Sequence, residues 1–117
     1  MSAAEPARYE LAYGDLILRL DGAVIELLSI TREGSLRIHA NHAQVSLQPS
    51  NHGDQIEVRI GQNYGQEGDP QGPIVVDGNV HAPWGPFKVD VSEESRLRDL
   101  FAEAERRRVP VLGPVSY

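Results

Sequence analysis

The stretch "GDLILRLDGAVIELLSI", residues 14–30, constrains the fold more than any other part of this chain. Two apolar runs flank an Asp21-Gly22 pair, and Asp-Gly between two such runs predicts a two-residue β-hairpin turn. The expected pairs are Leu20 with Ala23, Leu18 with Ile25 and Leu16 with Leu27 on one face, and Arg19 with Val24 and Ile17 with Glu26 on the other. Because the first face is entirely apolar, we expect it to be buried in an antiparallel sheet.

Alternation of apolar and polar residues continues after Gly34 and predicts five further strands. They are expected at residues 36–39, 43–48, 55–61, 73–82 and 87–91, and in the last of them Phe87, Val89 and Val91 are expected to point inward. Residues 61–73, "GQNYGQEGDPQGP", are too rich in Gly, Gln and Pro to pack. We therefore expect a mobile loop there.

The periodicity changes near the C-terminus, where apolar residues recur at the i, i+3, i+4 and i+7 spacing of one helical face. The residues in this pattern are Leu97, Leu100, Phe101 and Ala104. Ser92 is the expected N-cap of this helix, and Pro110 prevents its continuation. Residues 109–117 form an apolar, proline-rich tail that either lies against the domain or is available to another chain.

Length, charge and cysteine content limit the classes of partner. The chain has 117 residues and is predicted to form a single domain, 1–117, with a core over about residues 10–108. Seventeen acidic against eleven basic residues give a net charge of −6, which disfavours nucleic acid and membrane surfaces as partners. The absence of cysteine excludes disulfides and cysteine nucleophiles. No leader segment or membrane-spanning apolar run is visible, and Arg, Ala and Gly are abundant, so we expect a cytoplasmic, bacterial protein.

The order of the expected elements, seven short antiparallel strands followed by one amphipathic helix, resembles the pleckstrin-homology-like superfold in its compact bacterial form. The resemblance covers roughly residues 10–108 and rests on element order, not on a diagnostic motif. It implies a mostly β fold, either a seven-stranded antiparallel open barrel or two orthogonal sheets, capped by the C-terminal helix. Members that bind phosphoinositides carry basic residues between the first two strands, where this chain has Asp21-Gly22, so lipid binding is not implied.

Residues capable of chemistry are few and scattered. His39 and His42 make an H-x-x-H step, the only weak candidate for a metal site, but zinc sites use three or four converging ligands. No serine lies in a G-x-S-x-G motif, and "GQNYGQEG" lacks the lysine and the following helix of a phosphate-binding loop. We therefore expect no cofactor, no metal and no enzymatic activity.

The leading functional hypothesis is a non-catalytic protein–protein interaction module or adaptor. Trp84, between Pro83 and Pro86, either covers one end of the core or acts as an exposed anchor for a partner. The strand at 55–60 is the candidate sheet edge, and the tail is a candidate for homo-oligomer formation. The candidate partner-binding residues are Trp84, Tyr64, Ile56, Val58, Ile60, Val111 and Leu112.

Two alternative functions belong to other classes. One is a small acidic inhibitor or immunity-type protein whose negative charge steers it onto a basic enzyme or toxin. The other is a small-ligand-binding or catalytic protein that uses the barrel cavity together with His39, His42 or His81.

Overall fold

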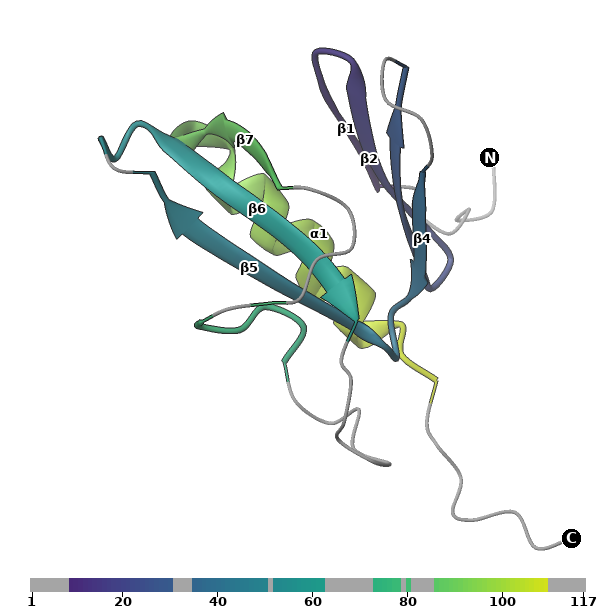
Figure 1. Ribbon diagram of the computed structural model, residues 1–117. Helices are drawn as coiled ribbons and strands as arrows, with labels where there is room; N and C mark the ends of the chain where they lie inside the picture. Colours follow the sequence, from purple (N-terminus) through teal and green to yellow (C-terminus); the bar gives the residue numbers. More distant parts are fainter. Residues whose placement is uncertain are drawn as a thin grey trace, which may run out of the picture.

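The computed structural model describes residues 9–30, 35–50, 52–62, 73–78, 80 and 86–109. Within these residues two antiparallel sheets and one helix make up the fold, with the four-stranded sheet on the right of Figure 1 and the three-stranded sheet in front of the helix. In chain order the elements are β1 (Tyr9–Tyr13), β2 (Leu16–Asp21), β3 (Val24–Ser29), β4 (Leu36–His39), β5 (Ala43–Pro49), β6 (Gln55–Gln62), β7 (Phe87–Asp90), the 3-10 turn η1 (Val91–Glu93) and α1 (Glu94–Arg106).

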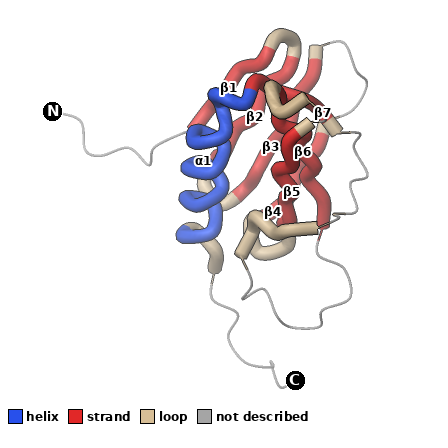
Figure 2. The backbone as a smooth tube through the Cα atoms, turned by 90° about the vertical axis from the view of Figure 1, so that its left-hand side faces the viewer, coloured by secondary structure: helices blue, strands red, loops and turns tan. Residues whose placement is uncertain are grey.

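Within each sheet the strands follow one another in chain order, β1-β2-β3-β4 and β5-β6-β7, and the chain passes from one sheet to the other between β4 and β5. The predicted mostly β class with a C-terminal helix is therefore confirmed, and the two sheets are not closed into a barrel. Figure 2 shows α1 running along one side of the strands, next to β1 and β2.

The core lies between the inner faces of the two sheets and one face of α1. The four-stranded sheet contributes Leu18, Leu20, Ile25, Leu27 and Ile38, the three-stranded sheet contributes Val45, Ile56, Val58, Ile60, Phe87 and Val89, and α1 contributes Leu97, Leu100, Phe101 and Ala104. Each of these side chains is at most 7% exposed. The helical face predicted from the sequence is thus confirmed.

The β2–β3 hairpin forms as expected, but the predicted register is wrong. Asp21 pairs with Val24, so Gly22 and Ala23 are the two turn residues. Gly22 has a φ of +60° and Ala23 does not have a positive φ, which is the pattern of a type II′ turn with Gly at its first central position. The shift keeps the same side chains inside, with Leu20 opposite Ile25 and Leu18 opposite Leu27. On the other face it brings Arg19 opposite Glu26 instead of Val24.

Three further details of the prediction are corrected. Residues 73–78 do not form a strand, and Val75 makes only a one-residue parallel bridge to Val45. Val91 lies in η1 and is 39% exposed, so it does not point inward. Ser92 is not the N-cap of α1; that position is Glu93, which makes no capping side-chain hydrogen bond. Asp90 caps η1 instead, and its carboxylate accepts a 2.9 Å hydrogen bond from the backbone N–H of Ser92.

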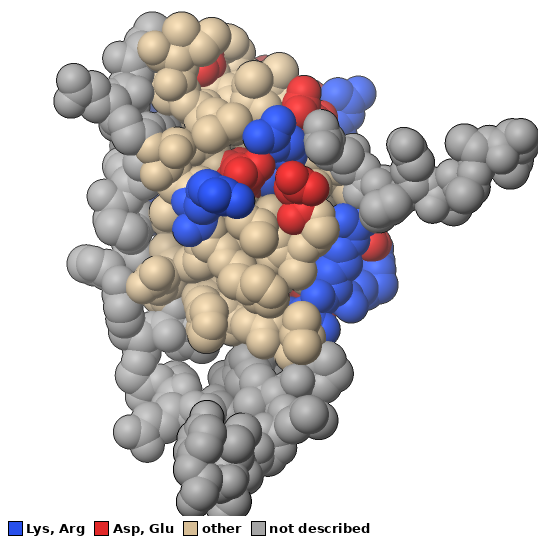
Figure 3. All heavy atoms as spheres, turned by 90° about the vertical axis from the view of Figure 1, so that its right-hand side faces the viewer, with Lys and Arg blue, Asp and Glu red and all other residues tan. Residues whose placement is uncertain are grey.

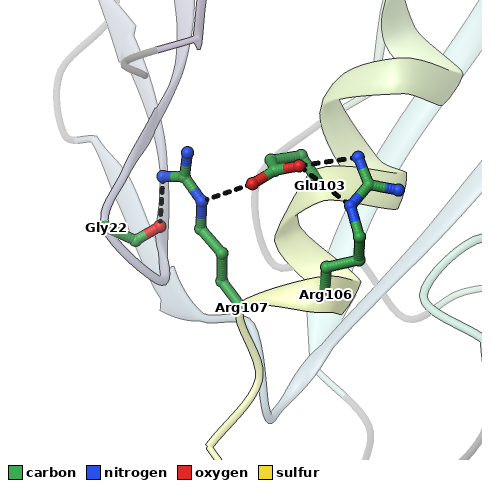
Figure 4. Close-up of polar contacts among 4 residues, drawn as sticks. All are labelled: Gly22, Glu103, Arg106 and Arg107. Atoms are coloured by element: carbon green, nitrogen blue, oxygen red, sulfur yellow. Dashed lines mark hydrogen bonds and ion pairs between the residues drawn. The ribbon is translucent and has the colours of Figure 1, made fainter. Parts of the chain in front are cut away.

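The C-terminal end of α1 is tied to the turn of the β2–β3 hairpin (Figure 4). Arg107 donates from Nη1 to the backbone carbonyl of Gly22 at 3.0 Å and from Nε to Glu103 at 2.8 Å. Arg106 binds the other oxygen of Glu103 at 2.6 Å. The Arg107 guanidinium also lies over the ring of Tyr9, 5.9 Å from its centroid. These contacts hold the C-terminal end of the helix against the four-stranded sheet.

Candidate interaction surface

One face of the four-stranded sheet points away from the core. Because side chains alternate along a strand, burial of Leu18, Leu20, Ile25 and Leu27 turns their neighbours to the opposite side, which we call the outer face. Strand pairing arranges the outer face in three rows: Ala12, Ile17 and Leu28; Glu10, Arg19, Glu26 and Arg37; and Asp21, Val24 and His39. Ile30 lies two residues beyond Leu28 along the same strand, on the side away from the charged row. In Figure 3 charged side chains form a band across this face, with uncharged surface on either side.

The middle row, which we call the charge row, is a continuous chain of ion pairs across all four strands. Arg19 lies 3.7 Å from Glu10 through Nη1 and donates from Nε to Glu26 at 2.8 Å. Arg37 donates from Nε to the second carboxylate oxygen of Glu26 at 2.9 Å. Charges therefore alternate from β1 to β4 in the order negative, positive, negative, positive.

Glu26 is the central anion of the charge row and is only 7% exposed, which is unusual for a carboxylate on an outward face. The hydrogen bond from Arg19 lowers the pKa of the Glu26 carboxyl below its ordinary value, with Arg37 acting in the same direction and desolvation opposing it. The carboxylate is thus charged at neutral pH. Arg37 is 67% exposed and extends this network to the surface.

The row beside the charge row is apolar. Ile17 and Leu28 lie opposite each other and are half-buried. Ile30 is 83% exposed, and its N–H donates to the carbonyl of Asp15 at 3.1 Å, which continues the hairpin pairing beyond β3. Its position in this pairing places Ile30 on the same face as Leu28. The outer face therefore combines the charge row with an adjacent apolar strip, which consists of Ala12, Ile17, Leu28 and Ile30.

A groove lies beside α1, apart from the outer face. A groove of about 240 Å³ is lined by Pro73, Val75, Arg98, Phe101, Ala102 and Glu105. The neighbouring edge of β5 is already occupied by the chain itself, because Val45 exchanges backbone hydrogen bonds with Ile74 and Val76 at 2.8 and 2.9 Å. Glu105 accepts a further 2.8 Å bond from the Ile74 N–H. At Val45 this edge is consequently not open to another strand.

The two weak metal candidates, His39 and His42, lie near each other. The ring centroids of His39 and His42 are 6.4 Å apart, and Nδ1 of His39 accepts a 3.0 Å hydrogen bond from the Asn41 N–H. Among the described residues no group of three or more His, Cys, Asp or Glu side chains converges in a way that could hold a metal ion. Within the described ranges, His39 and His42 therefore do not belong to a cluster of metal ligands.

The prediction that the strand at residues 55–60 is a sheet edge is wrong. β6 is the central strand of its sheet and pairs with both β5 and β7. Ile56, Val58 and Ile60 are each at most 3% exposed, so these three candidates are core residues and cannot bind a partner. Alternation in sequence identifies the buried face of a strand but not the number of its neighbours, which explains the error.

The other candidates fall outside the described residues. These are Trp84, Tyr64, Val111 and Leu112, together with His81. The predicted start of the loop at residue 61 is too early, because Gly61 and Gln62 belong to β6. Its residues 63–72 lie outside the described ranges. In the tail only Val109 is described, and its backbone N–H and C=O both bind the Asn41 side-chain amide at 2.9 Å.

Sequence reasoning missed the charge row. Its members were available as outward positions of alternating strands, and Arg19 and Glu26 were assigned to one face of the hairpin. Glu10 was not assigned to a strand, however, and the register placed Arg19 opposite Val24. The row became visible only when β1 and β4 were placed on either side of the hairpin.

Comparison of the chain with protein-family models, with curated proteins and with solved structures found no match. No helix in the described part of the chain is long and apolar enough to cross a membrane.

Proposed function

We propose that this chain is a non-catalytic protein-interaction module of a bacterial cytosolic system and that its outer face is the binding surface. The observation that carries the proposal is the exposure of Ile30, 83%, on the same face as the charge row, with Ile17 and Leu28 between them. Aromatic or aliphatic side chains surrounded by paired charges are typical of protein-binding surfaces, where the apolar part supplies affinity and the charges supply orientation. We further propose that the fold belongs to the pleckstrin-homology-like superfold, which the order of four strands, three strands and a helix supports.

The experiment compares protein capture by face variants and matched controls. Ile30→Ser removes the exposed apolar side chain, and Arg37→Glu reverses the exposed end of the charge row. The matched controls are Val91→Ser, another exposed apolar residue, and Lys88→Glu, an exposed cation on the three-stranded sheet. Each tagged protein is incubated with native cytosol, and captured proteins are quantified by mass spectrometry after circular dichroism has confirmed folding.

We expect wild type and both controls to capture the same protein. Ile30→Ser and Arg37→Glu are each expected to capture about fivefold to thirtyfold less of it, since contacts of this kind are worth about 1 to 2 kcal/mol each. Equal capture by all five proteins would show that the outer face is not the binding surface.

A further inference from the structure

We propose that the outer face binds a second copy of this chain in a two-fold symmetric dimer, with the two charge rows facing each other. This inference rests on the proposed function, because it names the partner of the same surface. Two properties of the outer face carry it: the order of charges in the charge row, and the position of the apolar strip relative to that row.

The charge row is complementary to itself in one orientation. A two-fold axis parallel to the strands, between β2 and β3, places β1 opposite β4 of the second copy and β2 opposite β3. Glu10 then faces Arg37 of the second copy, and Arg19 faces Glu26, so all four facing charges have opposite sign. A two-fold axis along the row instead places every charged residue opposite the same residue of the second copy. Because like charges facing each other are strongly disfavoured, the row selects the first orientation.

The same orientation matches the apolar strip with itself. The axis keeps each row at its own height along the strands, so Ile17 faces Leu28 of the second copy on both sides of the axis. Ile30, whose N–H donates to Asp15 just before β2, comes to lie level with Asp15 of the second copy, beside the matched Ile17 and Leu28. Removal of these apolar side chains from water supplies affinity, while the charge row fixes the register.

The ion pairs within one copy leave room for those across the interface. In the described part of the chain Arg37 binds Glu26 through Nε, and a guanidinium has further N–H donors on its two Nη atoms. Glu10 is 47% exposed and lies 3.7 Å from Arg19, a loose contact. The outermost charges of the row are therefore the ones available for the second copy, and they are the ones that the symmetry brings together.

The size of the surface predicts a weak dimer. Four strands spaced by about 4.8 Å, each with about five residues rising 3.4 Å, give a face of roughly 300 Å² per copy. Two such faces bury roughly 600 Å² in total, below the roughly 1,200 Å² at which stable specific interfaces begin, so the dimer is expected to be transient and to dissociate on dilution. Because the charge row contributes ionic contacts, raising the salt concentration from about 0.05 to 0.5 M is expected to weaken the dimer.

The test exchanges charges between two variants. Arg37→Glu makes the two ends of the row negative and Glu10→Arg makes both positive, so each variant by itself places like charges at both ends of the interface. When the two variants are mixed, both ends carry opposite charges again. Sedimentation velocity on each variant, on the equimolar mixture, on wild type and on the Lys88→Glu control is followed from about 5 to 500 µM, a range suited to a small interface.

We expect wild type and Lys88→Glu to dimerise, each charge variant to dimerise at least about tenfold more weakly, and the mixture to recover the wild-type constant. Circular dichroism establishes that the variants fold. Ile30→Glu, at a position 83% exposed, provides a second variant that is expected to be monomeric should either charge reversal fail to fold.

Three outcomes would overturn the inference. Wild type that stays monomeric at the highest concentration, a mixture that stays monomeric while wild type dimerises, or a dimer that survives both charge reversals each excludes this interface. The first outcome separates the two proposals: if capture from cytosol still depends on Ile30 and Arg37, the face binds a different protein and only the identity of the partner is wrong. If capture is also independent of these residues, the proposed function fails with it.

Discussion

Replacement of Phe101 by Ala tests how the helix holds the two sheets together. Phe101 is fully buried and belongs to the face of α1 that packs into the core. The substitution leaves helix propensity unchanged or slightly improved, because Ala is the best helix former. Any loss of stability therefore reports on packing.

The expected loss follows from two terms. Burial of a phenyl side chain contributes about 2 to 3 kcal/mol by transfer from water. The ring leaves a void of roughly 100 Å³, which adds up to about 2.4 kcal/mol if the surroundings do not relax. The neighbouring groove, lined by Pro73 and Ala102, allows part of the void to close or fill with water. We therefore expect a decrease of about 3 to 5 kcal/mol in the free energy of unfolding, a large part of the 5 to 15 kcal/mol typical of one domain.

Urea denaturation followed by circular dichroism measures this loss. The control is Asp99→Ala, an exposed position of the same helix, which is expected to change stability by less than about 0.5 kcal/mol. A loss below about 1 kcal/mol for Phe101→Ala, with an unchanged denaturant slope, would show that α1 does not close the core.

Three other substitutions test polar and backbone features. Glu26→Gln is expected to lower the free energy of unfolding by about 1 to 3 kcal/mol at pH 7, because Arg19 loses an ionic partner at a site that is 7% exposed. The pKa of Glu26 is lower in the folded than in the unfolded protein. The stability difference between wild type and Glu26→Gln is therefore complete above the unfolded pKa of about 4.3 and shrinks as the pH falls through the folded pKa. Urea titrations at several pH values measure this change. Gly22→Ala, at φ +60° with nothing near the added carbon, is expected to lose about 1 to 2 kcal/mol from backbone strain alone, and an unchanged thermal midpoint would contradict the assigned turn. Asn41→Ala removes both hydrogen bonds to the Val109 backbone, so amide exchange at Val109 is expected to accelerate while global stability changes by at most about 1 kcal/mol.

The sequence alone determined which side chains of the hairpin and of the helix are buried. Leu18 and Leu27 in the hairpin, and Leu97 and Phe101 in the helix, follow periods of 2 and 3.6 residues, and all are at most 1% exposed. Periodicity is a local property that reports the face of each element, so it can be read without knowledge of any partner. The mostly β class with a C-terminal helix followed from the same patterns.

The register of the hairpin shows where local reasoning ends. A turn at Asp21-Gly22 and a turn at Gly22-Ala23 both bury Leu18 and Leu20, because the two registers differ by two residues and preserve the alternation. The apolar pattern therefore could not separate them. The geometry of the turn determines the register: of the turn residues only Gly22 has a positive φ, and this fits the turn at Gly22-Ala23.

Only the tertiary structure decided which strands are neighbours, and the candidate surface depends on that. Val58 alternates as an edge strand would, yet β7 pairs along β6 and makes it central. Glu10, Arg19, Glu26 and Arg37 are spread over 28 residues of sequence, and pairing of four strands brings them into one row. Strand pairing is a non-local choice made by packing of whole faces, so a pattern within one strand predicts what that strand buries but not which charges meet on its other side.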